Sequence, residues 1–108
     1  MQDESVFVAL TERVLAAIGE ALDAADSDAD WSENDGVLTI ECGSGRIIVN
    51  RHVPNRELWV AAPSGGFHFR SQEGAWRDTR NGEELGAALQ RLLRELNVAG
   101  VELSRLPA

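Results

Sequence analysis

Apolar side chains recur at steps of three and four residues in two stretches, residues 4–25 and residues 81–96. This period matches one face of an amphipathic α-helix. In the second stretch Asn81 is expected to cap the helix, and Glu84 lies where a capping box needs its carboxylate. The pattern therefore predicts one helix near each end of the chain. The apolar stripes consist of Phe7, Leu10, Val14, Ile18 and Leu22 in the first helix, and of Leu85, Ala88, Leu89, Leu92, Leu93 and Leu96 in the second.

Between the two predicted helices, short runs rich in β-branched and aromatic residues are separated by turn residues at regular intervals. This spacing is typical of an antiparallel meander. Two helices with one apolar face each would cover one side of such a sheet and leave the other to solvent. The predicted fold class is α+β, a two-layer sandwich with the N- and C-terminal helices packed on one face of an antiparallel sheet of five to six strands. The expected strands are residues 29–32, 36–42, 45–50, 57–62, 66–70 and 75–79.

Alternation along the strand at residues 57–62 predicts on which side of the sheet Trp59 lies. Leu58 and Val60 share the face that should meet the helices, because side chains alternate along a strand. Glu57 shares the other face with Trp59 and should meet solvent. Trp59 is therefore expected on the open side, where an exposed Trp suits a contact hot spot. The alternatives are a reversed alternation or a loop that covers the Trp.

One hydrophobic core is expected, because the helices and the strands each present one apolar face to it. Trp31 and Trp76 are expected to pack inward, and His68 should point away from its neighbours Phe67 and Phe69. The expected core consists of Phe7, Leu10, Val14, Ile18, Leu22, Leu38, Ile40, Ile47, Val49, Leu58, Val60, Phe67, Phe69, Trp76, Leu85, Leu89, Leu92 and Leu96.

Length and composition indicate a single globular domain over residues 1–108, with 44% hydrophobic residues. No apolar run approaches the ~20 residues of a membrane span. The first residues, MQDES, are acidic where a signal peptide would be basic. A soluble, cytoplasmic protein is therefore expected.

Charge is distributed unevenly along the chain, whose net charge is -8. Residues 1–41 hold eleven acidic residues and a single Arg, whereas residues 42–108 carry a net charge of +2. Every basic residue is Arg. This balance argues against nucleic acid as a partner, because phosphates need cationic contacts. It favours cations, or a protein with a basic surface.

The acidic residues that follow the first helical stripe are the strongest candidates for chemistry. Glu20, Asp23 and Asp26 are spaced i, i+3, i+6, so they would share one helical edge if the helix extends that far. Asp28 and Asp30 alternate, so an extended segment would point both the same way. Hard cations prefer oxygen ligands, and an array of carboxylates would hold them weakly. The alternative is an ordinary solvated face.

Other reactive side chains are sparse. Cys42 is the single cysteine, so it can form no disulfide within the chain, and it is expected to be a half-buried structural residue. His52 and His68 lie far apart in the sequence, and neither has an evident partner for triad chemistry. No glycine-rich phosphate loop is present. No catalytic residue is therefore predicted.

Several segments resemble the frataxin family in its bacterial branch. They are, in order, the acidic first helix, GVLTI, IIVNR, ELWVAAPSGGFHF and GAWRDTRNGEEL. The resemblance covers nearly the whole chain and implies the same two-layer fold. It also implies a role in iron–sulfur cluster assembly, weak binding of ferrous or ferric iron on an acidic ridge, and docking on a cysteine desulfurase.

The resemblance places the family's functional positions on this chain. It implies an iron-binding ridge at Glu20, Asp23, Asp26, Asp28 and Asp30, and a partner-binding sheet surface at Asn50, Arg51 and Trp59. The chain departs from the family in two ways. Gly19, Ala24 and Ala25 interrupt the acidic run, and His52 and Glu57 stand where the family often has Gln.

The expected function is that of an iron-binding regulator or accessory protein of cluster assembly, not an enzyme. Its expected partners are the cysteine desulfurase and the iron–sulfur scaffold protein, with no nucleic acid and no membrane. The expected state is a monomer, with iron-dependent oligomers as the alternative. An iron oxidase or iron-storage activity on the same ridge is the competing hypothesis, and it would need a more closed site. An acidic mimic of nucleic acid would need carboxylates spread over a long face.

Overall fold

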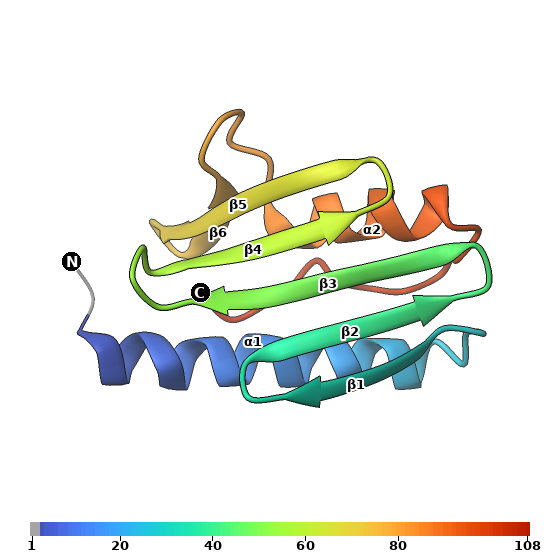
Figure 1. Ribbon diagram of the computed structural model, residues 1–108, viewed down its shortest axis with the longest axis horizontal. Helices are drawn as coiled ribbons and strands as arrows, with labels where there is room; N and C mark the ends of the chain where they lie inside the picture. The colour runs from blue at the N-terminus through green and yellow to red at the C-terminus, as the bar shows by residue number, and fades with distance from the viewer. Residues whose placement is uncertain (1–2) are drawn as a thin grey trace.

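The structure, a computed structural model, describes residues 3–108 and contains two helices and six strands (Figure 1). Their order is the one that the sequence predicts, a helix, a run of strands and a second helix. The elements are α1 (Glu4–Ala24), β1 (Asp30–Asn34), β2 (Val37–Cys42), β3 (Gly45–His52), β4 (Glu57–Ala62), β5 (Gly65–Gln72), β6 (Ala75–Asp78) and α2 (Leu85–Glu95).

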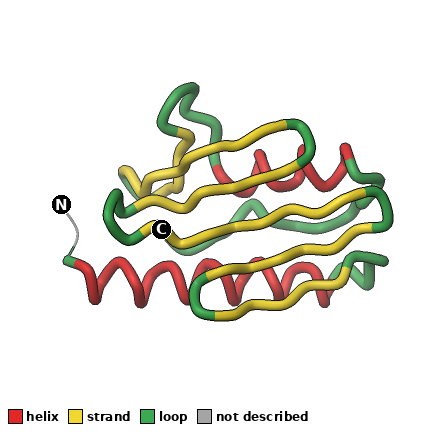
Figure 2. Tube along the Cα trace, viewed as in Figure 1, coloured by secondary structure: helices red, strands yellow, loops and turns green. Residues whose placement is uncertain are grey.

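The six strands form one sheet in chain order, and every strand is antiparallel to its neighbours. Both helices lie behind this sheet in the view of Figure 1, so they cover one face and leave the other open. The residues after α2 form no strand and run between the two helices (Figure 2). The predicted α+β two-layer sandwich is confirmed. Among residues 3–108, no helix is both long enough and apolar enough to cross a membrane.

A tight hairpin joins β1 to β2 and sets the register of the sheet edge. Asp35 and Gly36 have φ angles of 52° and 83°, so both central residues are left-handed. Asp-Gly is favoured at such two-residue turns because Gly adopts this conformation without strain. The turn pairs Asn34 with Val37 and thereby opposes Trp31 to Ile40. The side chain of Trp31 consequently leans toward the helices, as the sequence predicts.

The predicted core is confirmed at every position except one. Trp76 and Phe7 are fully buried and meet edge to face, with ring centroids 6.4 Å apart. Phe67 is the exception, since it packs against the core but stays half-buried. The guanidinium of Arg91 lies 5.5 Å from the centre of its ring. Phe67 therefore lies at the edge of the core, next to the Arg91 guanidinium, and not at the centre of the core.

The second helix begins at Leu85 and not at residue 81, which corrects the predicted cap. Gly82 has a φ angle of 78°, and Glu84 forms an isolated antiparallel bridge with Arg77. The chain therefore turns at residues 81 and 82 and is extended at Glu84, where the sequence predicts a helix. Glu84 is the N-cap itself, and its carboxylate accepts a hydrogen bond from the third residue of the helix. Asn81 instead stabilises the preceding turn, where its side chain accepts from the Glu83 amide.

The C-terminal segment completes the helical layer. Val101 and Leu103 are buried and belong to the segment that runs between the two helices (Figure 2). The indole N–H of Trp76 donates a hydrogen bond of 2.7 Å to the carbonyl of Pro107. At Gly86 a Cβ atom would lie 1.9 Å from the carbonyl oxygen of Leu103, so the helix must carry Gly there to admit the segment.

Candidate functional site

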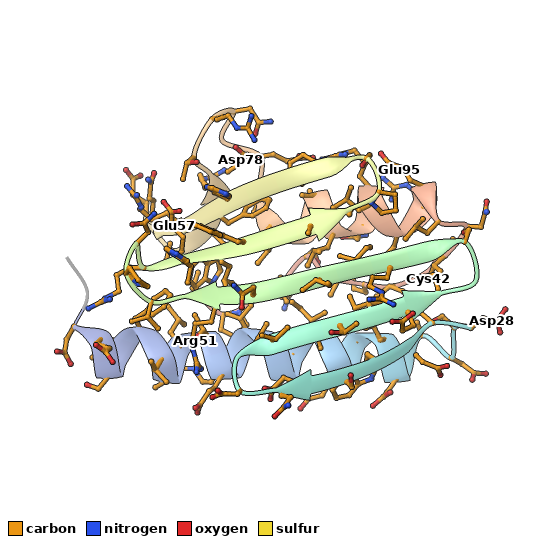
Figure 3. All side chains as sticks on the ribbon, in the orientation of Figure 1. Asp28, Cys42, Arg51, Glu57, Asp78 and Glu95 are labelled. Atoms are coloured by element: carbon orange, nitrogen blue, oxygen red, sulfur yellow. The ribbon has the colours of Figure 1, made fainter. Side chains whose placement is uncertain are left out.

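Five exposed carboxylates gather where α1 ends and β1 begins, and we refer to them as the acidic corner. They come from the last two turns of the helix, the connecting loop and the first residue of the strand. Asp28 marks this corner at one end of the long axis in Figure 3. The acidic corner consists of Glu20, Asp23, Asp26, Asp28 and Asp30, the same residues that the resemblance proposes as a ridge.

The carboxylates of the acidic corner are arranged less regularly than their spacing in the sequence predicts. The helix ends at Ala24, and Asp26 adopts a left-handed conformation with a φ angle of 51°. Asp26 therefore leaves the helical edge shared by Glu20 and Asp23. Asp28 lies in a bend and only Asp30 belongs to the strand, and both are exposed, on either side of the buried Ala29.

Trp31 on β1 contacts both the acidic corner and helix α1. Its indole N–H donates a hydrogen bond of 2.9 Å to Oδ1 of Asp23. The indole ring lies over Gly19, where a Cβ atom would come within 2.7 Å of two ring carbons. Sequence reasoning missed this contact, although Gly19 and Asp23 are one helical turn apart and so share a face. Gly19 interrupts the acidic run because the ring needs its space.

The carboxylates of the acidic corner do not converge on one point. Within residues 3–108, no three His, Cys, Asp or Glu side chains are grouped closely enough to hold a metal ion. The donor chemistry suits a hard cation, because every ligand atom offered is a carboxylate oxygen. The geometry suits a hydrated ion held loosely, with most of its water shell retained.

The open face of the sheet carries the second set of candidate residues. Asn50, Trp59 and His68 lie directly opposite one another across β3, β4 and β5. Arg51 follows Asn50 on β3 and so points to the helical side, where 15% of its side chain is exposed and its guanidinium lies 3.9 Å from Asp35. The structure therefore brings Asn50 and Trp59 together and separates Arg51 from both.

Trp59 lies between two imidazoles, and we refer to these three side chains, His52, Trp59 and His68, as the ring stack. The rings of His52 and Trp59 have centroids 3.6 Å apart and are inclined by 11°. Those of Trp59 and His68 are 4.3 Å apart and inclined by 6°. Trp59 is thus on the predicted open face but half-buried, because a ring covers each of its faces. The cross-strand pairing that creates the stack could not be read from either His alone.

Glu57 is buried on this face, which corrects the expectation that it meets solvent. Only 4% of the residue is exposed. Its carboxylate accepts hydrogen bonds of 2.9 Å from the indole N–H of Trp59 and 2.6 Å from Arg70. Nδ1 of His68 lies 3.7 Å away. Burial raises the pKa of Glu57, but the hydrogen bonds from Trp59 and Arg70 and the charge of Arg70 outweigh it and leave the pKa below its usual value.

A shallow hollow of about 260 Å³ adjoins the ring stack on the open face. Its volume would admit one or two side chains of a partner. It is lined by apolar residues of the strands and by Trp59 and His68 of the ring stack. Residues that line it include Ile48, Asn50, Trp59, Ala61, Gly66 and His68.

Cys42 is the remaining side chain with reactive potential. It is half-buried at the end of β2. Burial raises the pKa of its thiol, and the charge of Glu41 adds to this effect. The thiolate is therefore disfavoured, which agrees with the expected structural role.

Known proteins resemble this chain along nearly its full length. A family model described as a frataxin-like domain matches residues 1–97. The iron–sulfur cluster assembly protein CyaY of Paraburkholderia phymatum is 51% identical over 87 residues, covering 80% of this chain and 83% of the relative. The CyaY protein of Neisseria meningitidis serogroup B is 42% identical over 107 residues, covering 98% of this chain and 100% of the relative.

Solved structures share the fold. Frataxin from Psychromonas ingrahamii, of the CyaY family, superposes with a TM-score of 0.88 at 25% identity, covering 96% of this chain and 100% of the other. Trimeric yeast frataxin complexed with ferrous iron superposes with a TM-score of 0.67 at 27% identity, covering 89% of this chain and 87% of the other.

Proposed function

Because this chain belongs to the frataxin-like family, we propose that it is an iron-binding regulator of iron–sulfur cluster assembly that docks on a cysteine desulfurase and its scaffold protein. The assembly role follows from the names of its relatives, and the iron from a structural neighbour complexed with ferrous iron. The role of the individual residues rests on the geometry of this chain.

One observation carries the proposal: the acidic corner and the ring stack are separate, accessible features of one small molecule. Asp28 and Glu57, which mark the two regions, lie at opposite ends of the long axis in Figure 3. The carboxylates of the acidic corner are exposed, and the hollow beside the ring stack is shallow. Accessible surfaces of this kind suit the binding of ions and proteins better than the chemistry of an enclosed active site.

The acidic corner supplies charge for two purposes. Its carboxylate oxygens match the preference of ferrous iron for hard ligands, and their exposure favours rapid, weak exchange of the ion. The same charges attract a basic surface on the desulfurase at long range, because residues 1–41 carry a net charge of -10. Iron bound at the corner lowers this charge and therefore weakens the attraction, which would link iron supply to docking.

The open face supplies short-range contact. Trp59 and Asn50 form a row beside the hollow, where a partner's apolar side chain would lose water on binding. The acidic corner speeds the encounter, whereas the open face holds the complex together.

An anaerobic titration with ferrous iron, followed by admission of oxygen, tests the proposal. The expected result is weak binding without rapid catalytic oxidation, and a change in desulfurase turnover when this protein is added. If added iron reduces this change in desulfurase turnover, the result would support the link between iron and docking. Rapid multiple-turnover oxidation at the acidic corner, with no effect on the desulfurase, would favour the iron oxidase instead.

A further inference from the structure

Glu57 is an anomaly on the open face of the sheet. A carboxylate beside a half-buried Trp on a solvent-facing surface would ordinarily reach into water. Here the side chain is 5% exposed, and its oxygens are engaged by Trp59 and Arg70. Desolvating a carboxylate is costly unless charge-assisted hydrogen bonds compensate, so this arrangement fixes the conformations of the groups that supply them.

The hydrogen bond from Trp59 to Glu57 restricts the orientation of the indole. The donor is Nε1 of the ring, and the acceptor is Oε1 of a residue two positions earlier on the same strand. Rotation of the indole about its side-chain torsions would break this bond and also unstack His52 and His68. The carboxylate and the two imidazoles therefore favour a single orientation of the ring.

This orientation determines what a partner meets. Both faces of the indole are covered by imidazoles, and its N–H is already donated. A docking protein would contact the edge of the ring stack, with the exposed rim of His68 beside it. Recognition of a ring edge requires the ring to be held still, because a freely rotating Trp would lose conformational entropy on binding.

We propose that Glu57 is a positioning residue for docking, which holds Trp59 edge-on in the ring stack before the partner arrives. The inference rests on the proposed function of the open face and adds a specific role for a buried residue of that face. Glu57 makes no contact with the partner in this arrangement and acts through Trp59.

The hydrogen bonds of Glu57 give the role a signature that simple packing would lack. His52 lies opposite Glu57 on β3, His68 and Arg70 approach from β5, and Arg77 lies opposite Arg70 on β6. Nδ1 of His68 lies 3.7 Å from Oε1 of Glu57. A neutral side chain of the same shape keeps an oxygen that accepts from the indole N–H, whereas Ala removes it, so the indole N–H reports whether Glu57 holds the ring.

The first test uses the free protein and four variants. NMR follows the indole N–H of Trp59, assigned by its loss in Trp59→Phe, and the ring signals of His52 and His68. Glu57→Ala should speed hydrogen exchange of that indole by roughly tenfold and shift the signals of both imidazole rings. Glu57→Gln should retain most of the exchange protection, because its amide oxygen still accepts the hydrogen bond. Glu41→Gln removes a carboxylate from the same face at a distance from the stack and should change neither quantity.

The second test measures binding to the cysteine desulfurase by surface plasmon resonance. Glu57→Ala should dissociate several-fold faster, and Glu57→Gln should lie between it and the wild type. Unchanged indole exchange and imidazole shifts in Glu57→Ala would overturn the positioning role, as would wild-type dissociation in that variant. Wild-type dissociation in Trp59→Ala would instead overturn the docking role of the open face, and the free-protein exchange rates would still show separately whether Glu57 holds the ring.

Discussion

The indole N–H of Trp31 donates to Oδ1 of Asp23 across 2.9 Å, which joins the first strand to the end of the first helix. One carboxylate of the acidic corner is thereby held in place by a different element. Asp26 and Asp28 lie in the loop that this contact closes. The position of the corner relative to the sheet therefore depends on how Trp31 packs over Gly19.

Replacing Gly19 by Ala should destabilise the protein. Helix propensity alone favours Ala by roughly 1 kcal/mol. The new Cβ atom, however, would lie 2.7 Å from carbons of the Trp31 ring, which must then move from its place against α1. A net loss of about 1–2 kcal/mol in the free energy of unfolding is expected. Urea denaturation measures it, with Ala16→Gly on the exposed side of α1 as the propensity control; a more stable Gly19→Ala would contradict the proposed contact.

Neutralising Asp23 and Asp26 together should weaken iron binding. In the wild type, ferrous iron or a divalent substitute should first perturb the amides of residues 20–30, because the exposed carboxylates are there. The double variant Asp23→Asn, Asp26→Asn should bind more weakly and be slightly more stable without metal, since like charges are removed. NMR titration and thermal melts check both effects. Glu73→Gln with Glu102→Gln is the charge-matched control, and shifts centred on His52 or His68 would refute the assignment.

Truncating Leu92 should show how firmly the second helix is packed. The residue is 1% exposed and belongs to the buried cluster beneath the sheet. Leu92→Ala is expected to lower the free energy of unfolding by roughly 2–5 kcal/mol, through lost burial and the cavity left behind. Ala87→Gly on the exposed side of α2 provides a comparison without a cavity. A loss near zero at Leu92 in urea denaturation would be inconsistent with the packing of α2.

Glu57 should contribute to the pH dependence of stability. Because its pKa in the folded protein is lowered, its contribution is complete above the ordinary value of about 4.5 and is lost as the pH falls through the lower, folded value. Glu57→Gln should therefore be less stable than the wild type at pH 7, by about 1 kcal/mol. The difference should shrink below pH 4.5. Urea denaturation between pH 7 and pH 3 tests this; a difference that grows with acidity would have the wrong sign.

Charge and contact should act on different rate constants of docking. Replacing Asp23, Asp26 and Asp28 by Asn should mainly slow association with the desulfurase and flatten its salt dependence. Trp59→Ala should mainly speed dissociation, at a cost of roughly 2 kcal/mol or more. Its effect on the isolated fold should be limited to about 1–2 kcal/mol from lost stacking. Binding kinetics and thermal melts of the same variants test these expectations. If Trp59→Ala greatly lowers the melting temperature and leaves the dissociation rate unchanged, Trp59 is a purely structural residue.

Much of the fold was predictable because the signals are local. The period of the two helices, the alternation along the strands and the turn residues each depend on a few neighbouring positions. The same alternation placed Trp59 on the open face, and it could also have separated Arg51 from Asn50, since adjacent residues of a strand face opposite ways. The predicted start of α2 was wrong because the left-handed Gly82 and the bridge between Arg77 and Glu84 keep residues 81–84 out of the helix.

The sequence by itself determined the two-layer fold, the face of Trp59 and the location of the acidic corner. Tertiary structure alone decided that Glu57 is buried, that His52 and His68 enclose Trp59, and that Trp31 holds Asp23. The physical reason is that periodicity records which side of an element a residue occupies. Contacts between elements depend on register and side-chain packing, which bring together residues whose separation in the sequence carries no repeating signal.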